Sequence, residues 1–291
     1  PQKRRFFKVF FAQRLGILTH SEHRFGPISE LAVNLLKISQ KFVVVEIIAD
    51  SEDLENKTLR KVSGAFAEDP LRVLRVARFA SKLKFLDFKI EEETLDLMKS
   101  IVVSGEIRTL SKERIWMETY KALKTKSPEI FFSVLQDVGA LNEICTLKIM
   151  NLKALESASL NIQDTAIRWA ILISGNTNMK EINTAFNLPK EIIEVSSVCE
   201  SLVEFKGTQP SAKSILEIIH HNDLLRKPKR FFRALEASVF FNNSEKVMKI
   251  NWYEIYDIVN NVDAETSLKD GKLIAKKLQE DRLQVLEKYL Q

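Results

Sequence analysis

The pattern of apolar residues along the chain changes near residue 69. Before that point, residues 42–48 form a short β-branched run, which predicts a strand. After it, apolar residues recur at helical spacing almost to the C-terminus. Asp69 and Pro70 predict the start of the first of these helices, because an acidic N-cap followed by proline is typical of helix N-termini. The chain is therefore predicted to be mostly α, with a partial α/β unit at its N-terminus.

Further helices are predicted over residues 91–103, 111–123 and 127–138, with Gly139 ending the last of the three. The second half continues as amphipathic helices with polar breaks at residues 174–178, 206–210, 242–244 and 263–267. The final segment, residues 271–291, predicts an amphipathic helix with a basic polar side.

Composition narrows the classes of protein that need to be considered. The chain has 291 residues, of which 45% are hydrophobic and 29% charged, so it has enough apolar residues for a core. Its longest uninterrupted apolar run, residues 169–173, is too short to cross a bilayer. The net charge of +5 is compatible with a polyanionic partner. Two cysteines, Cys145 and Cys199, are too few for a disulfide framework or a zinc site, and we expect buried thiols in a cytoplasmic protein.

Three arginines recur every third residue on the helix that follows Pro70. Arg72, Arg75 and Arg78 fall within a sector of about 120° on a helix. The opposite side carries the apolar residues Val73, Leu74, Val76, Ala77 and Ala80. The arginines have two interpretations at this point. They could form a solvated basic face with Asp69 as a simple N-cap, or they could bind an anion or a nucleobase edge, which the planar guanidinium matches in two-point contact.

Three segments carry a resemblance to a known family. Residues 54–79, 111–118 and 131–141 closely resemble the bacterial class II tRNA nucleotidyltransferases, the CCA-adding enzymes, more than their poly(A) polymerase relatives. The resemblance implies an enzyme that adds C, C and A to tRNA 3′ ends from CTP and ATP with Mg²⁺. It also implies a domain order: a remnant of the nucleotidyltransferase head over residues 1–60, a neck over 61–145, and a tRNA-binding body and tail over 146–291.

The same resemblance suggests roles for the residues of the neck. In this family the Glu-Asp-x-x-Arg segment pairs with the edge of the incoming base in place of a nucleic-acid template. Carried over, Asp69 and Arg72 would select the base, and Arg75 and Arg78 would contact the bound nucleotide. A carboxylate beside a guanidinium offers both acceptors and donors, as reading a base edge requires. Residues 111–118 are expected to brace the neck, with Ser111 as a helix N-cap.

The metal-binding part of the family pattern is not recognisable. Nucleotidyl transfer needs divalent metals held by carboxylates, which the family supplies from an Asp-x-Asp pair after a Gly-Gly-x-x-Arg-Asp start and before an Arg-Arg-Asp segment. We therefore assign no metal ligand. Either the N-terminal part of the head is missing from this chain, or the product is a degenerate paralogue that binds RNA without catalysis. The opening at Pro1 without an initiator methionine and the intact neck favour truncation.

Some family members carry a His-Asp phosphohydrolase domain in the C-terminal half. The histidines here are His20, His23, His220 and His221, and none of them is followed by aspartate. His220 and His221 are adjacent, so on a helix they point about 100° apart and do not converge easily on one metal. The second half is therefore expected to lack this activity.

Two basic segments of the second half are candidates for RNA contact. Residues 226–233 hold five basic residues and two phenylalanines, and basic groups bind phosphates while aromatics can stack on unpaired bases. The alternative is that Phe231 and Phe232 are core anchors of a helix beginning near Pro228. The candidate RNA-binding residues are Arg226, Lys227, Lys229 and Arg230, together with Lys272, Lys276 and Lys277 of the last helix. The family implies recognition of tRNA by shape.

Three other functions remain open from sequence. A catalytically inactive homologue would bind tRNA without extending it. A poly(A) polymerase would add long A tails and would not use CTP. A helical interaction scaffold would bind neither nucleotide nor tRNA.

Overall fold

The computed structural model describes residues 53, 55–61, 66, 69–205, 211–241, 249–263 and 270–290. The predicted strand at 42–48 and the polar breaks at 206–210 and 242–244 lie outside these residues, as do His20 and His23. Internal contacts divide the chain into two compact units. The first extends to Leu147 and includes Lys180–Asn187, and the second comprises Lys148–Met179 and Leu188–Gln291. Their assignment to neck, body and tail stays a prediction.

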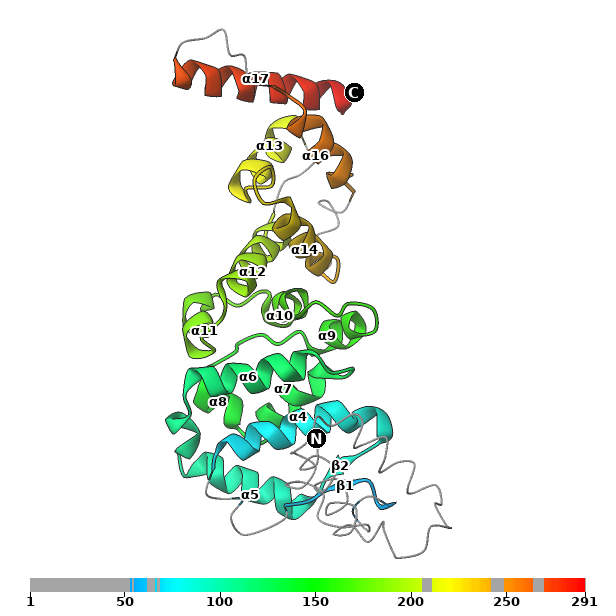
Figure 1. The fold of residues 1–291 in the computed structure, drawn as a ribbon, viewed down its shortest axis with the longest axis vertical. Helices are drawn as coiled ribbons and strands as arrows, with labels where there is room; N and C mark the ends of the chain where they lie inside the picture. The colour runs from blue at the N-terminus through cyan, green and yellow to red at the C-terminus, as the bar shows by residue number, and fades with distance from the viewer. Residues whose placement is uncertain are drawn as a thin grey trace, which may run out of the picture. The chain divides into compact units, whose positions relative to one another are not determined.

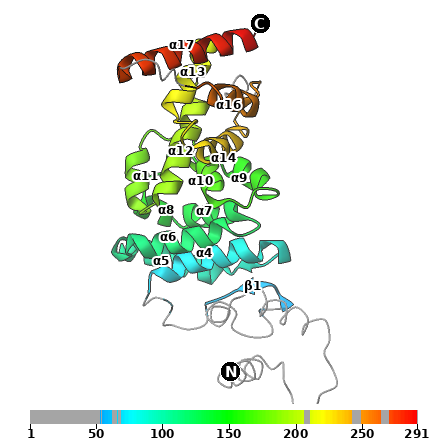
Figure 2. The ribbon, with the colours of Figure 1, turned by 45° about the horizontal axis from the view of Figure 1, so that its top comes forward.

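In its described residues, the first unit is helical apart from two very short strands (Figure 1). Its elements are β1 (Thr58–Leu59), α4 (Leu71–Leu83), the 3-10 helix η3 (Lys84–Leu86), β2 (Lys89–Ile90), α5 (Glu92–Val103), the 3-10 helix η4 (Glu106–Thr109), α6 (Lys112–Leu123), α7 (Pro128–Asp137) and α8 (Ala140–Ile144). The strands pair in parallel, Thr58 with Lys89 and Leu59 with Ile90. β2 contacts α4 and pairs with β1 (Figure 1), and Figure 2 shows β1 below α4.

Helix α4 is the packing centre of this unit, because it contacts both α6 and α7. The predicted apolar side is buried, with relative exposures of 0–5% for Val73, Leu74, Val76, Ala77 and Ala80. The helix begins at Leu71 with Pro70 as its N-cap, one residue later than the sequence pattern predicts. The Asp69 carboxylate still caps it, since its Oδ1 accepts the Leu71 N–H at 3.0 Å.

The other predicted boundaries in this unit agree with the structure to within one residue. Ser111 is the N-cap of α6, and its side chain accepts the Arg114 N–H at 3.4 Å. Gly139 follows the end of α7 with φ of +80°, a left-handed conformation that glycine adopts without steric cost. The mostly helical fold predicted from the sequence is confirmed.

The second unit is built from helices alone in its described residues. They are α9 (Leu152–Ser159), α10 (Thr165–Ile173), α12 (Lys190–Val203), α13 (Ala212–His221), α14 (Pro228–Ser238), α16 (Trp252–Asn260) and α17 (Gly271–Tyr289). Between α10 and α12 lies α11 (Met179–Ala185), which falls in the first unit except for Met179. Helix α10 packs against α9, α12 and α14, while α17 packs against α13 and α16. No helix in the described part of the chain is both long enough and apolar enough to cross a bilayer.

The core of the second unit holds a buried arginine. Arg168 lies on α10, where every residue from Ala166 to Ile173 is buried, and the Arg168 side chain is itself fully buried. Its Nε donates to the Ile162 carbonyl at 2.6 Å and its Nη2 donates to the Ser159 carbonyl at 2.9 Å. The Ser159 carbonyl belongs to the last residue of α9 and the Ile162 carbonyl lies three residues beyond it, so a cation satisfies carbonyls at and just after the C-terminus of the helix.

Replacing Arg168 with methionine should destabilise the protein, because two buried carbonyls lose charged hydrogen-bond donors. We expect a loss of about 2–4 kcal/mol in the free energy of unfolding. Urea denaturation followed by far-ultraviolet circular dichroism would measure it. The matched control is Lys153→Met on α9, where the residue is exposed. Equal stability of the two variants would contradict this role for Arg168.

Candidate functional site

The N-terminus of α4 brings Asp69 together with an arginine from a different helix. Nη2 of Arg114, on α6, donates to both carboxylate oxygens of Asp69, at 3.1 Å to Oδ1 and 2.9 Å to Oδ2. Both side chains are partly exposed, 48% for Arg114 and 34% for Asp69. Asp69 is therefore a cap for α4 and an ion-pair partner for α6 at the same time.

Arg72 lies one turn further along α4 and has an unsatisfied donor. The residue is half-buried, and its Nη1 is buried without a hydrogen-bond partner among the described residues. Its main-chain N–H bonds to the Asp69 carbonyl at 3.0 Å, so the helix backbone fixes the two residues relative to each other. A buried donor without a partner is uncommon, and it is costly unless a ligand or water satisfies it.

Two more cations lie further along the same side of α4. Arg75 and Lys82 are both half-buried. Burial lowers the pKa of Lys82 below its ordinary value, and the nearby positive charge of Arg78 lowers it further. This side of the helix is therefore electropositive and only partly accessible to solvent.

The third arginine of the row is buried, so the interpretation of the row as a solvated basic face is wrong for Arg78. Its side chain is only 10% exposed, and its Nε donates to the Glu118 carboxylate on α6. Lys121 donates to the other oxygen of Glu118 at 2.8 Å. The Arg78 guanidinium also lies 4.2 Å from the centre of the Phe79 ring. The physical reason is that α6 packs over this end of α4 and supplies the counter-ion that a buried guanidinium requires.

The electrostatics of Glu118 follow from this arrangement. Burial alone would raise the pKa of the Glu118 carboxyl, but the Arg78 charge and the hydrogen bonds from Lys121 and Arg78 hold it below its ordinary value. Glu118 is thus ionised and serves as the internal counter-ion of the arginine row.

Sequence reasoning gave residues 111–118 a bracing role but did not identify the residues involved. They are Arg114 and Glu118, four residues apart on one face of α6, which contact Asp69 and Arg78 on α4. A basic residue and an acidic residue at this spacing indicate a helix face that could match the opposite charges of a second helix. The sequence contains that signal, but it does not say which helix provides the partners.

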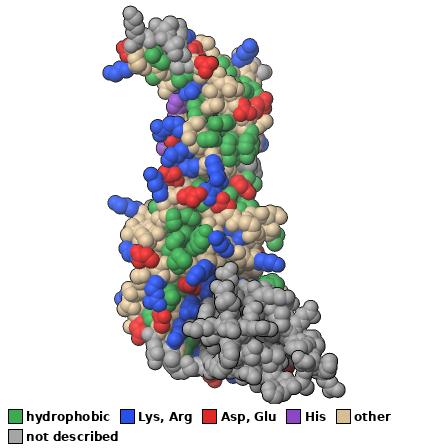
Figure 3. Space-filling model, viewed as in Figure 1, with side chains coloured by type: hydrophobic (Ala, Val, Ile, Leu, Met, Phe, Trp, Pro, Cys, Tyr) green, Lys and Arg blue, Asp and Glu red, His purple; other side chains and the backbone are tan. Residues whose placement is uncertain are grey.

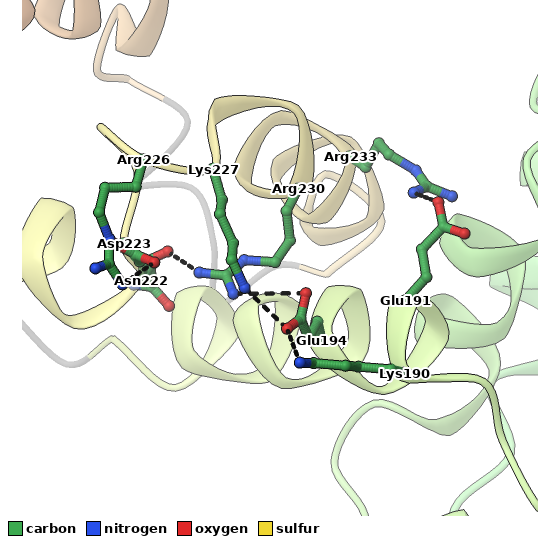
Figure 4. Close-up of polar contacts among 9 residues, drawn as sticks. All are labelled: Lys190, Glu191, Glu194, Asn222, Asp223, Arg226, Lys227, Arg230 and Arg233. Atoms are coloured by element: carbon green, nitrogen blue, oxygen red, sulfur yellow. Dashed lines mark hydrogen bonds and ion pairs between the residues drawn. The ribbon is translucent and has the colours of Figure 1, made fainter.

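In the second unit, the basic segment 226–233 is largely neutralised by acidic side chains (Figure 4). Arg226 pairs with Asp223 at 2.7 Å, while Lys227 and Arg230 both pair with Glu194 of α12, at 2.9 and 3.8 Å. The hydrogen bond from Lys227 is the main cause of a lowered pKa at Glu194.

Arg233 extends this neutralised cluster toward α10 and α12. It pairs with Asp164, the N-cap of α10, at 2.7 Å and with Glu191 of α12. Because Arg233 is only 17% exposed, this contact is part of the helix packing. Together with the pairs at Glu194, it joins α14 to α12.

Only part of the segment remains accessible for binding. Lys229 is exposed and forms no ion pair with the described residues, and the Arg226 side chain is 81% exposed despite its pairing.

The two phenylalanines of the segment are packed against aromatic residues of α16. Phe231 is fully buried and packs on Trp252, so it is a core residue, as one of the two interpretations expected. Phe232 is half-buried and stacks on Tyr253 with ring centres 4.1 Å apart.

The lysines of α17 differ in their partners. Lys276 pairs with Glu280 at 3.9 Å and Lys277 with Asp281 at 2.9 Å, each one turn along the same helix. Lys272 is exposed and forms no ion pair with the described residues. On the face drawn in Figure 3, Lys and Arg side chains of the second unit are interspersed with Asp and Glu.

No metal centre is assigned. Within the described residues, no cluster of three or more His, Cys, Asp or Glu side chains could hold a metal ion. His220 and His221 are both exposed at the end of α13. Cys145 and Cys199 are buried free thiols, as predicted, and burial raises the pKa of both.

Comparisons with known proteins match the chain to one family model and to a set of CCA-adding proteins. A family model described as "Probable RNA and SrmB- binding site of polymerase A" matches residues 87–145. The "CCA-adding enzyme" of Pseudomonas putida is 38% identical over 210 residues, which cover 69% of this chain and 57% of that protein. The "Multifunctional CCA protein" of Psychromonas ingrahamii is 31% identical over 315 aligned positions, covering 90% of this chain and 77% of that protein. The chain thus spans little more than half the length of the Pseudomonas relative.

Solved structures of CCA-adding enzymes have a fold similar to that of this chain. A Thermotoga maritima CCA-adding enzyme complexed with tRNA matches with a TM-score of 0.56 at 19% identity, over 81% of this chain and 62% of that one. A CCA-adding enzyme in complex with ATP matches with a TM-score of 0.59 at 18% identity, over 81% of this chain and 61% of that one. At these identities the likeness is one of fold.

Replacing Glu118 with glutamine should leave the buried Arg78 charge without a counter-ion. We expect a loss of about 3 kcal/mol in the free energy of unfolding. The exposed Lys61–Glu93 pair provides the control, because Glu93 is 76% exposed and Glu93→Gln should cost less than about 1 kcal/mol. Chemical denaturation at neutral pH would measure both variants.

The difference in the free energy of unfolding between the Glu118→Gln variant and the parent chain should also depend on pH. Because the folded-state pKa of Glu118 lies below the ordinary value of 4.5, ionised Glu118 stabilises the fold above that pH. That contribution is lost as the pH falls through the folded-state pKa. The stability gap between variant and parent should therefore be constant near neutrality and close in acid. A gap that widened in acid would contradict the assignment.

Proposed function

The chain belongs to the family of CCA-adding enzymes, and on that premise we propose that it binds CTP and ATP beside α4 and takes part in building the CCA end of tRNA. The observation that carries the proposal is the buried Nη1 of Arg72, which has no partner among the described residues. A ligand that accepts a hydrogen bond would remove the cost of that donor.

The two residues at the start of α4 suit the bases that they would select. Cytosine and adenine each carry an exocyclic amino group, whereas uracil and guanine carry an oxygen at the corresponding position. A carboxylate such as Asp69 accepts from an amino group and repels an oxygen, and a guanidinium such as Arg72 donates to a ring nitrogen. The pair would therefore favour CTP and ATP over UTP and GTP.

The remaining arginines would act on the rest of the nucleotide. We propose that Arg75 contacts the bound nucleotide, as the family resemblance implies. Arg78 could add to the positive potential beside α4, but its Nε is engaged by Glu118, so any contact to a nucleotide must come from its other nitrogens. We expect substitution of Arg78 to affect folding before it affects binding.

The chemical step needs more than this surface provides. The family uses Mg²⁺, which in nucleotidyl transfer activates the primer hydroxyl and stabilises the leaving pyrophosphate. No described residue is assigned as a ligand, so we propose nucleotide selection for this part of the chain and derive no metal-dependent step from it.

We further propose that the second unit contacts tRNA phosphates through its accessible cations. Lys229 and Lys272 would contribute most, because they are exposed and form no ion pair with the described residues. Arg226 would also contribute, because its side chain is 81% exposed despite its pairing with Asp223. Lys227, Arg230, Lys276 and Lys277 are engaged by carboxylates and would have to share or exchange those partners. Such contacts recognise tRNA by shape and charge.

Two alternatives are separated from this proposal by one experiment. The chain is incubated with tRNA that lacks its CCA end, CTP, ATP and Mg²⁺, and extension is read on a gel. Binding of CTP and tRNA without extension would identify an inactive tRNA-binding homologue. Long A tails without CTP use would identify a poly(A) polymerase.

Asp69→Ala and Arg72→Ala should each abolish the preference for CTP and ATP over UTP and GTP. Each lost contact to a base edge is worth about 1–3 kcal/mol of discrimination. Affinity for tRNA should change by no more than a few-fold, since neither side chain belongs to the proposed RNA surface. Isothermal titration of the four nucleotides and of tRNA would measure both.

The control for Asp69→Ala is Asp270→Ala. Asp270 caps α17 by accepting the Lys272 N–H at 2.8 Å, so this variant also removes a capping carboxylate. It should leave nucleotide preference unchanged. If the parent chain shows no preference among nucleotides, or if Asp69→Ala loses tRNA binding and keeps base choice, the proposal is wrong.

Lys229→Ala and Arg226→Ala should each weaken tRNA binding by a similar factor for every tRNA tested. Each should also reduce the slope of log affinity against log salt concentration by about 1, because one phosphate contact is lost. Filter binding at several salt concentrations would measure the slope. Lys153→Ala, an exposed lysine outside the proposed surface, should leave the slope unchanged.

A further inference from the structure

Asp69 has fewer free acceptor positions than an isolated carboxylate. A carboxylate offers about four lone-pair positions. The Leu71 N–H and Arg114 Nη2 occupy two of them on Oδ1, at 3.0 and 3.1 Å, and Arg114 Nη2 occupies one on Oδ2, at 2.9 Å. Among the described residues, the remaining capacity is therefore mainly on Oδ2.

These contacts also fix the orientation of the carboxylate. The Leu71 N–H belongs to the backbone of α4 and cannot rotate, whereas Arg114 reaches across from α6. Without the arginine, a single main-chain bond would hold Asp69, and the carboxylate could turn about its last side-chain bond. With it, Oδ1 is held from both helices and Oδ2 is held from α6.

We propose that Arg114 is a positioning residue for base choice: it holds Asp69 so that Oδ2 is offered to the amino group of the incoming cytosine or adenine. This inference rests on the nucleotide-selecting role proposed for Asp69. Arg114 itself need not touch the nucleotide, and its contribution is to present one acceptor atom in one direction.

The position of Arg114 favours this role over a purely structural one. The Arg114–Asp69 pair is partly exposed, and exposed pairs contribute little to folding. The same two helices are already joined by the Arg78–Glu118 pair, whose side chains are 10% and 6% exposed. Because the buried pair and the packing of the two helices already hold α6 against α4, the partly exposed pair is not needed for that attachment and can serve the orientation of Asp69.

The test compares binding of CTP with binding of UTP, which differ at the group that Asp69 would recognise. In the full chain, Arg114→Ala should lower the ratio of CTP to UTP affinity by about tenfold, with most of the loss in CTP binding. Arg114→Lys keeps the charge but lacks the planar guanidinium, so its ratio should lie between those of Arg114→Ala and the parent. Isothermal titration gives the affinities, and thermal denaturation gives the stability of each variant.

The matched control is Arg108→Ala. The Arg108 side chain is 71% exposed and pairs with Glu143 in the same unit, so its removal also breaks an ion pair between an arginine and a carboxylate. Arg108→Ala should keep the parent ratio and stability. An unchanged ratio in Arg114→Ala, or an equal loss of affinity for CTP and UTP together with a large fall in melting temperature, would overturn the inference.

Failure of this inference can be told from failure of the proposed function by including Asp69→Ala. If Asp69→Ala lowers the ratio and Arg114→Ala does not, Asp69 reads the base without help from Arg114. If Asp69→Ala also leaves the ratio unchanged, or the parent chain binds neither nucleotide, the nucleotide-selecting role of α4 is wrong and the inference falls with it.

Discussion

The ion pair between Arg78 and Glu118 is the contact on which the surface of α4 depends. A helix that carries three arginines on adjacent turns repels itself, and it can pack on that side only where an anion enters the contact. Glu118 is that anion, since α6 brings it to the most buried of the three guanidinium groups. The row is thereby divided: Arg78 serves the packing of α4 against α6, and Arg72 keeps a donor that no described residue satisfies.

In the second unit, cations that lie between packed helices are likewise paired with carboxylates. Segment 226–233 is strongly basic in sequence, but Glu194, Glu191 and Asp164 convert three of its cations into links between α14, α12 and α10. What remains for a polyanion is the part that faces solvent, chiefly Arg226 and Lys229. A dense run of basic residues therefore indicates a binding surface only after its internal counter-ions have been identified.

Sequence alone predicted the elements well, because their determinants are local. The Ser111 cap, the proline start of α7 and the positive φ of Gly139 all depend on residues within one turn of the helix end. The family resemblance likewise pointed to the helix of Asp69 and Arg72. It could not foresee that Arg78 is buried or that Arg114 holds Asp69, because these contacts join residues 40 and 45 positions apart. Helical periodicity indicates which residues share a face, but it does not indicate what covers that face.

The division of charges on α4 also separates the selection of a nucleotide from the transfer of its nucleotidyl group. Reading a base edge requires fixed donors and acceptors, which Asp69, Arg72 and their helix supports would supply without a metal. Nucleotidyl transfer requires carboxylate-bound cations, and no described residue is assigned to that task. Because the two requirements fall on different groups, base preference in binding can be measured on this chain whether or not it extends tRNA. Such a preference would establish the α4 surface as the template substitute independently of catalysis.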